Sequence, residues 1–219
     1  MDIRCFTVGQ FQVNTYLIRD PATGAAAIVD TGESRELVGR LASLDPAPDV
    51  RAILLTHGHI DHAGGLVWLQ ERYDVPTYLP RAELPMFECL PEQGDWFGMP
   101  ALNRPCGRVD HLLDDGDTVE LGELQLRFLA TPGHTPGQGC YYDDRDIIVG
   151  DTVFAGSVGR TDFPMSDPSL ARHSLRRLFD LPGDLRVHSG HGPVTTLAAE
   201  LRRNPFLGFL RIERGMVRS

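Results

Sequence analysis

Short apolar runs recur along the chain and predict buried strands. Four of them lie directly before segments rich in glycine, histidine and aspartate, at residues 52–55, 124–130, 147–149 and 185–188. Runs of this length bounded by turn residues are typical of buried strands. Three further β-rich runs near the start, 3–8, 15–19 and 25–29, are separated by turn residues and predict antiparallel strands.

Apolar residues at helical spacing predict the helices. We expect them at residues 34–44, 81–90, 168–181, 195–203 and 205–214. Strands and helices occur in two similar series, before and after about Arg81, so periodicity alone predicts a mixed α/β fold. The 219 residues are enough for one domain with a sizeable core, and we expect that domain to span residues 1–219.

One segment, residues 56–62, concentrates candidate chemistry directly after the run 52–55. It reads THGHIDH and brings His57, His59, Asp61 and His62 within six positions. Leu66, Leu69 and Tyr73 predict a helix that begins inside this motif, with Asp61 in its first turn, where a negative charge is favoured. Imidazoles with a carboxylate suit zinc, iron or manganese rather than calcium.

Three later strand ends supply further candidate ligands. His134 lies in TPGHTPG, Asp151 in GDT and His191 in GHGP, each beside glycine. Glycine lets the backbone approach a bound ion closely. Five of the 8 histidines therefore fall at these strand-end sites, which predicts one metal centre built from the whole chain.

These motifs resemble those of the metallo-β-lactamase-fold hydrolases. The segments GSVGRTDFP, at 156–164, and RRNPFL, at 202–207, resemble the short glyoxalase II-like branch, the YcbL-like hydroxyacylglutathione hydrolases. The resemblance runs from about Val13 to Leu207. It implies an αββα sandwich of two facing mixed sheets with helices outside, in the α/β class.

The resemblance also implies how the ligands are shared between two divalent metals, zinc first, with iron or manganese as alternatives. It assigns three ligands to one metal and three to the other, bridged by Asp151. The first set is His57, His59 and His134, and the second is Asp61, His62 and His191.

The reaction implied is hydrolysis of a glutathione-type thioester such as S-lactoylglutathione. A hydroxide shared by the metals would attack the carbonyl, with Asp61 and Asp151 as catalytic residues. No GxSxG elbow offers a serine alternative. Full-length glyoxalase II proteins have a longer C-terminal helical region with basic glutathione contacts. This sequence lacks most of it, so we expect an open cleft and a looser substrate choice.

Three other functions stay open at this stage. A glutathione-persulfide dioxygenase would use one iron on His57, His134 and Asp151. The same metals could instead hydrolyse lactones, phosphoesters or β-lactams. A non-catalytic metal-binding scaffold would have lost ligands, and none is lost here.

Two charged residues near the motifs have alternative interpretations. Arg160, in GRTDF, could bind a substrate carboxylate, since a guanidinium suits bidentate binding, or pair internally with Asp162. Asp30 ends the run 25–29 and could orient a ligand imidazole or cap the following helix.

The segment 94–107 combines Trp96, Phe97 and Met99 with glycine and proline and shows no period. It predicts a loop that either rims the substrate cleft or tucks its aromatics into a small satellite core.

Composition limits the partners. The net charge is −9 and no basic stripe is present, so we expect no nucleic-acid binding, only a small-molecule thioester substrate. No apolar run approaches a membrane span, and no signal-peptide pattern precedes the first strand, so a cytoplasmic location is the default. The cysteines are scattered and form no CxxC motif, which predicts reduced and mostly buried thiols. Whether Cys106 is buried or exposed stays open. Oligomeric state is not readable.

Overall fold

The computed structural model describes residues 1–182 and 184–216. Its first sheet has six strands in the order β1-β2-β3-β4-β5-β6. Their bounds are β1 Asp2–Val8, β2 Val13–Arg19, β3 Ala25–Val29, β4 Asp49–Leu54, β5 Thr77–Pro80 and β6 His111–Leu113. The first three strands pair antiparallel, as predicted, and β3 to β6 pair parallel.

A second six-stranded sheet has the order β14-β13-β10-β9-β8-β7. Its strands are β7 Thr118–Leu121, β8 Leu124–Ala130, β9 Gly139–Tyr142, β10 Asp146–Gly150, β13 Arg186–Ser189 and β14 Thr195–Thr196. β9 and β10 form an antiparallel hairpin, and β10 pairs parallel with β13. A two-stranded ribbon, β11 Val153–Phe154 with β12 Ser157–Val158, follows β10.

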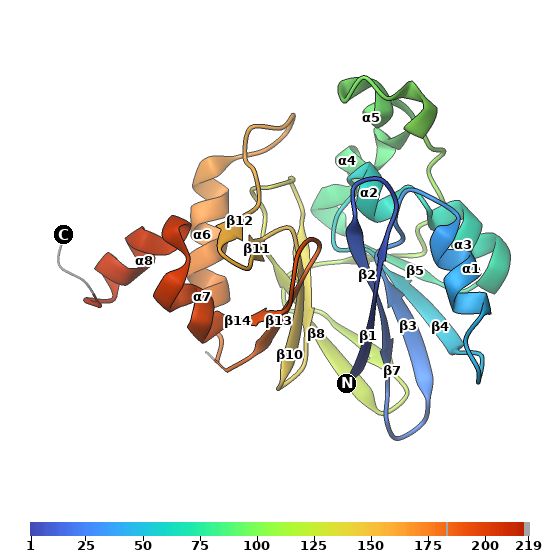
Figure 1. The fold of residues 1–219 in the computed structure, drawn as a ribbon, viewed down its shortest axis with the longest axis horizontal. Coiled ribbons are helices and arrows are strands. Elements are labelled where there is room, and N and C mark those ends of the chain that lie inside the picture. Colours follow the sequence, from blue (N-terminus) through green and yellow to red (C-terminus); the bar gives the residue numbers. More distant parts are fainter. Residues whose placement is uncertain (183, 217–219) are drawn as a thin grey trace.

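Helices cover the outer face of each sheet (Figure 1). Beside the first sheet are α1 Glu36–Ala42, α2 Ile60–Ala63, α3 Leu66–Tyr73, α4 Leu84–Glu88 and α5 Leu90–Trp96. Beside the second are α6 Pro168–Phe179, α7 Leu197–Arg203 and α8 Gly208–Glu213. Single 3₁₀ turns occur at Arg81–Glu83, Pro100–Leu102 and Pro205–Leu207. The αββα sandwich that the resemblance implied is thereby confirmed.

The core has three layers, which follow from the alternation of side chains along the strands. On β3, Ile28 packs into the cluster between the first sheet and its helices, while Ala27 and Val29 pack between the two sheets. A third cluster, with Leu175 and Leu178 of α6, lies between the second sheet and its helices. Both faces of each sheet are therefore buried, which explains the continuous apolar runs in the sequence.

Two predictions about the segment 81–107 were wrong in detail. The helix expected over 81–90 is divided into the turn Arg81–Glu83, α4 and the start of α5. Pro85 and Pro91 each lie in the first turn of a new helix, where proline is tolerated, and so separate the pieces. The expected loop 94–107 begins within α5 and contains the turn Pro100–Leu102.

The expectation of mostly buried thiols was also wrong. Cys140 is buried, but Cys5 and Cys106 are exposed and Cys89 is intermediate. Cys5 lies on β1 at the edge of the first sheet, where alternate side chains face solvent.

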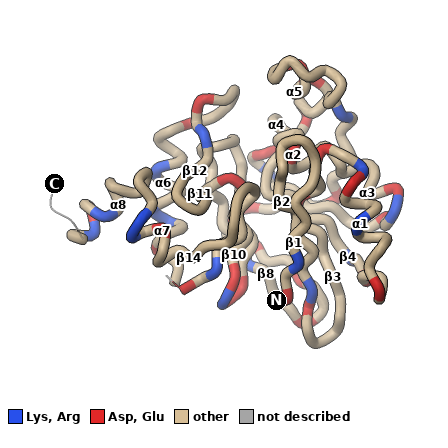
Figure 2. The backbone as a smooth tube through the Cα atoms, viewed as in Figure 1, with Lys and Arg blue, Asp and Glu red and all other residues tan. Residues whose placement is uncertain are grey.

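Acidic and basic residues occur together on the same elements over much of the chain (Figure 2). All 21 basic residues are arginine, because the sequence contains no lysine. Many pair with acids, as Arg81 does with Asp114 and Arg176 with Glu213. Within residues 1–182 and 184–216, no helix has the length and apolarity needed to cross a membrane.

Candidate metal centre

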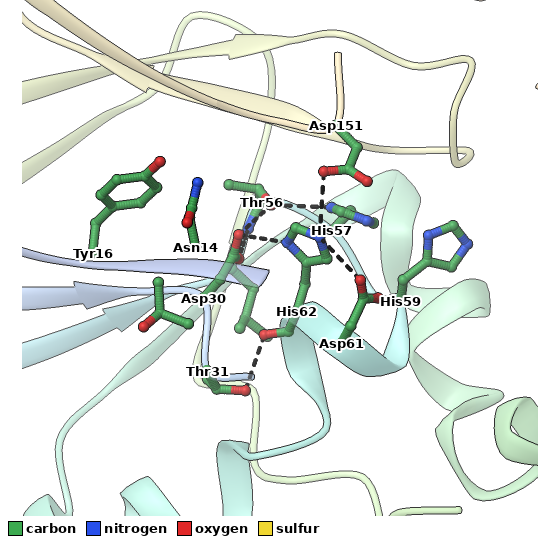
Figure 3. Close-up of polar contacts among 12 residues, drawn as sticks. Asn14, Tyr16, Asp30, Thr31, Thr56, His57, His59, Asp61, His62 and Asp151 are labelled. Atoms are coloured by element: carbon green, nitrogen blue, oxygen red, sulfur yellow. Dashed lines mark hydrogen bonds and ion pairs between the residues drawn. The ribbon is translucent and has the colours of Figure 1, made fainter. Parts of the chain in front are cut away.

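The four predicted ligand loops meet at one end of the sandwich. One loop follows β4 of the first sheet, and the other three follow β8, β10 and β13 of the second sheet. Each sheet therefore contributes to the site. Figure 3 shows His57, His59, Asp61 and His62 from the first of these loops facing Asp151 of the second sheet. α2 begins at Ile60, so Asp61 lies in its first turn as predicted. The single helix expected here is divided, because Leu66, Leu69 and Tyr73 belong to α3, which begins after Gly64 and Gly65.

All seven predicted ligands fall into three overlapping groups. In each group the potential ligand atoms lie within 4.8 Å of one another. The groups are His57, His59 and His134; His57, His62 and Asp151; and Asp61, His62 and His191. The first and third coincide with the two ligand sets that the resemblance implied.

Asp151 lies between these two sets. Its Oδ1 is 3.4 Å from Nε2 of His62, and its Oδ2 is 3.6 Å from Nε2 of His134. Oδ2 also lies 3.7 Å from Nε2 of His191. One carboxylate therefore faces imidazoles of both sets, the arrangement that a bridging ligand requires.

Several inward-facing atoms fit a cation. Nε2 of His57, Nε2 of His62 and Oδ1 of Asp151 are buried and have no hydrogen-bond partner among the described residues. Unpaired buried polar atoms are costly unless an ion or water satisfies them. Five imidazoles and two carboxylates suit zinc, iron or manganese, and the donor set therefore fits divalent metals of this kind.

Neighbouring groups fix the outward nitrogens of the imidazoles. Nδ1 of His62 lies 2.8 Å from Oδ2 of Asp30, and Nδ1 of His57 lies 3.0 Å from Oγ1 of Thr56. Nδ1 of His134 lies 2.8 Å from the carbonyl oxygen of Arg160. Such contacts set the tautomer and ring orientation and leave Nε2 for a metal. Of the two interpretations of Asp30, the contact with a motif imidazole is confirmed.

For His57, His59 and Asp61 the electrostatics favour the metal-binding form. Burial, followed by the neighbouring imidazoles, lowers the pKa of His57 well below its ordinary value. Burial lowers the pKa of His59 to about 3, with His134 adding to the effect. Burial opposes ionisation of Asp61, but His62 and His191 outweigh it and lower the pKa of that carboxyl. Neutral imidazoles and an ionised carboxylate are the forms that coordinate metals. At His62 burial is outweighed by Asp61, Asp151 and Asp30, which raise the pKa of that imidazole well above its ordinary value.

Three buried polar residues hold the ligand loops, and the sequence did not reveal them. Gln138 accepts from the amide of Asp151, Gln93 accepts from the amide of Ile60, and Glu83 accepts from the amide of Gly58. Isolated glutamines and a glutamate within other segments carry no motif signal. Of these three residues, only Gln138 lies beside a recognisable motif, directly after TPGHTPG.

A cleft opens over the ligands. Four phenylalanines from different segments line it, together with Arg160: Phe11, Phe97, Phe154 and Phe163. The Phe97 ring lies 5.7 Å from that of Phe163, which in turn lies 5.5 Å from the ring of His59. Of the expected aromatic wall only Phe97 lines the cleft; Trp96 and Met99 are 37% and 42% exposed. The other three phenylalanines come from segments that gave no such signal.

Arg160 makes an internal ion pair at the edge of the cleft. Its guanidinium pairs with both carboxylate oxygens of Asp162 at 2.8 Å, so the internal ion pair is confirmed. It also lies 4.4 Å from the ring centroid of Phe163 and lines the cleft.

The geometry agrees with a family comparison. The sequence model of the metallo-beta-lactamase superfamily matches residues 8–191, from β1 to the last predicted ligand. The chain belongs to the metallo-β-lactamase superfamily. The resemblance drawn from the motifs is thus confirmed.

Individual relatives share nearly the whole length. Hydroxyacylglutathione hydrolase GloC of Haemophilus influenzae is 36% identical over 217 residues, covering 94% of this chain and 98% of GloC. BLEG-1 B3 metallo-beta-lactamase has a similar structure, with a TM-score of 0.85, 31% identity, and coverage of 94% of this chain and 100% of that one. TTHA1623, solved in a di-iron-bound form, gives a TM-score of 0.82 at 36% identity, covering 93% and 100%. The relatives of this chain therefore include superfamily members of more than one named activity.

Proposed function

We propose that this chain is a dinuclear metal-dependent hydrolase of glutathione-type thioesters, with S-lactoylglutathione as the first substrate to test. The proposal rests on the position of Asp151. One of its carboxylate oxygens faces His62 of one ligand set, and the other faces His134 of the other set. The relative named as a hydroxyacylglutathione hydrolase supports the choice of substrate.

The seven ligands would hold two metal ions, which when bound lower the pKa of a shared water and polarise a carbonyl oxygen. Asp61, ionised at neutral pH, would orient the attacking water. Its Oδ2 lies 3.2 Å from Nε2 of His191, and the residue lines the cleft. Hydrolysis adds water across the thioester and gives a carboxylate and a thiol. The thiolate needs little acid assistance, because a free thiol has a pKa of about 8.5.

The residues around the ligands would bind the rest of the substrate. The four cleft phenylalanines offer an apolar wall on both sides of the ligands, since Phe163 contacts His59 and Phe154 lies 6.0 Å from His191. Arg160 is the cation among the residues that line the cleft, and it would meet a carboxylate of the thiol carrier.

The test is metal content of protein purified without added metal, with S-lactoylglutathione turnover measured under nitrogen. Two metals per chain and oxygen-independent thioester cleavage support the proposal. His134→Ala should abolish turnover, whereas His173→Ala, an exposed histidine on α6, should not. One iron per chain, no cleavage, and oxygen uptake with glutathione persulfide would contradict the proposal and favour the dioxygenase.

A further inference from the structure

Glu83 is a completely buried carboxylate that the proposed chemistry does not use. It ends the 3₁₀ turn after β5, and its side chain is 0% exposed. Its Oε1 accepts a hydrogen bond of 2.9 Å from the amide of Gly58. Its Oε2 accepts from the hydroxyl of Thr135 at 2.8 Å and from the amide of Gly137 at 2.6 Å. Hydrogen bonds to a carboxylate in such a dry environment are strong.

These three donors belong to two different ligand loops. Gly58 lies between His57 and His59 after β4 of the first sheet, and Thr135 follows His134 after β8 of the second. One carboxylate therefore joins the backbone segments that carry all three histidines of one ligand set. The loops are also closely packed here. A Cβ on Gly58 would lie 2.7 Å from the amide nitrogen of Phe87, and one on Gly137 2.2 Å from that of Glu83.

The other ligand set is held by different residues. Asp30 contacts His62, as described above. The loop that carries His191 is held by Asn14, whose side-chain amide donates to the carbonyls of Ser189 and Gly192, while its backbone amide donates to Gly190. Among the described residues, Glu83 makes no hydrogen bond to the loop of His191 or to Asp61. Asp30 also accepts from Thr56, whose Oγ1 lies 3.0 Å from Nδ1 of His57, so it is Asn14 and Glu83 that distinguish the two sets.

From this arrangement we propose that Glu83 is a positioning residue that sets the metal affinity of the three-histidine site, His57, His59 and His134, independently of the second site. Without the carboxylate, the two loops lose their shared acceptor and His134 is no longer held against His59, 3.0 Å away. Groups that orient ligands in this way are typically worth a factor of about 10 to 100 in metal affinity. The inference rests on the dinuclear centre of the proposed function.

Two variants test Glu83. Glu83→Gln keeps the shape but turns an acceptor into a donor facing N–H and O–H groups. Thr135→Val removes one of the three bonds and retains the carboxylate. Glu200→Gln is the matched control, because Glu200 is also buried and accepts from an amide, a hydroxyl and a side-chain amide, those of Gly156, Thr195 and Asn204.

Each protein is stripped of metal, loaded with ¹¹³Cd²⁺ and followed by ¹¹³Cd NMR during competition with a chelator. The wild type should give two resonances, and the one lost in His134→Ala identifies the three-histidine site. Glu83→Gln should weaken cadmium binding at that site about 10- to 100-fold, and Thr135→Val should weaken it by less. In both variants the cadmium affinity of the other site should stay within threefold of the wild-type value. Glu200→Gln should leave both sites unchanged.

Two results would overturn the inference: unchanged affinities at both sites, or equal weakening at both. If Glu83→Gln yields no folded protein, Thr135→Val decides between the same outcomes. A wild type that binds fewer than two cadmium ions contradicts the dinuclear proposal itself, so the two failures are distinguishable.

Discussion

Oδ2 of Asp30 lies 2.8 Å from Nδ1 of His62, and the same carboxyl accepts from the amide and the hydroxyl of Thr56, both at 2.8 Å. Asp30 has a positive φ of 58°, a conformation that asparagine adopts more readily than most residues. We therefore expect Asp30→Asn to fold but to orient His62 poorly, because an amide has one acceptor oxygen for three donors. Metal affinity of the site containing His62 should fall at least tenfold in chelator competition. Unchanged affinity would show that Asp30 only supports the backbone.

Asp151→Ala should remove metal and activity together. The residue faces imidazoles of both ligand sets, so its loss leaves each set one donor short. Metal content by elemental analysis should fall below one per chain, with turnover reduced to background. A variant that keeps two metals and full turnover would exclude Asp151 as the bridge.

Arg160→Ala should raise KM for an anionic thioester about tenfold with little change in kcat, since a lost charge-assisted contact is worth roughly 1.5 kcal/mol. The backbone carbonyl that contacts His134 remains in this variant. Asp162→Ala serves as the control, because it breaks the ion pair but leaves the cation in place. If both variants raise KM equally, the ion pair shapes the loop and the guanidinium does not meet substrate.

Phe97→Ala should weaken binding of thioesters with apolar acyl groups, raising KM about tenfold for loss of a largely buried ring contact. Phe97 lies between Phe11, 6.1 Å away, and Phe163, 5.7 Å away, on the cleft wall. Trp96→Ala is the neighbouring control, because Trp96 does not line the cleft. Equal effects of the two substitutions on KM would indicate general loosening of α5.

The turn carboxylate Asp20 predicts a pH dependence away from the metal centre. The hydroxyl of Thr23, followed by the amides of Glu123 and Ala22, lowers the pKa of Asp20 to about 2. An unfolded aspartate has a pKa near 3.9, so the folded state favours the ionised form. Its stabilisation is present above about pH 4 and is lost as the pH falls towards 2.

Urea unfolding of metal-free protein should show this loss directly. The difference in free energy of unfolding between wild type and Asp20→Asn should shrink from pH 5 to pH 2. Asp20 joins the β2–β3 turn to the β7–β8 turn through the amide of Glu123. The pH-dependent difference therefore measures a contact between the two sheets. A difference that stays constant with pH would contradict the role of its charge.

The sequence predicted which side chains meet at this site for a physical reason. Metal chemistry restricts residue type, and strand ends flanked by glycine restrict position, so His134, Asp151 and His191 could be found without knowing how the sheets pack. Their division into two sets needed the resemblance, because spacing along the chain does not reveal which loops meet in space.

What could not be predicted depends on contacts between distant segments. Glu83 and Gln93 are ordinary polar residues on helical turns until burial brings them against the ligand loops. Phe11 and Phe154 reach the cleft from a hairpin tip and a short ribbon, neither of which has apolar periodicity. The helix boundaries at 84 and 90 likewise depended on the placement of single prolines within a continuous helical pattern.

The contact between Asn14 and the loop of His191 also bears on how the protein is made. Asn14 lies 175 residues before Ser189, whose carbonyl it binds. During synthesis the first sheet leaves the ribosome long before the segment that carries the last ligand. The side-chain amide of Asn14 therefore cannot bind the carbonyls of Ser189 and Gly192 until almost the whole chain has emerged from the ribosome. The second metal site is consequently completed late in translation, so a chain interrupted before residue 189 could not have it.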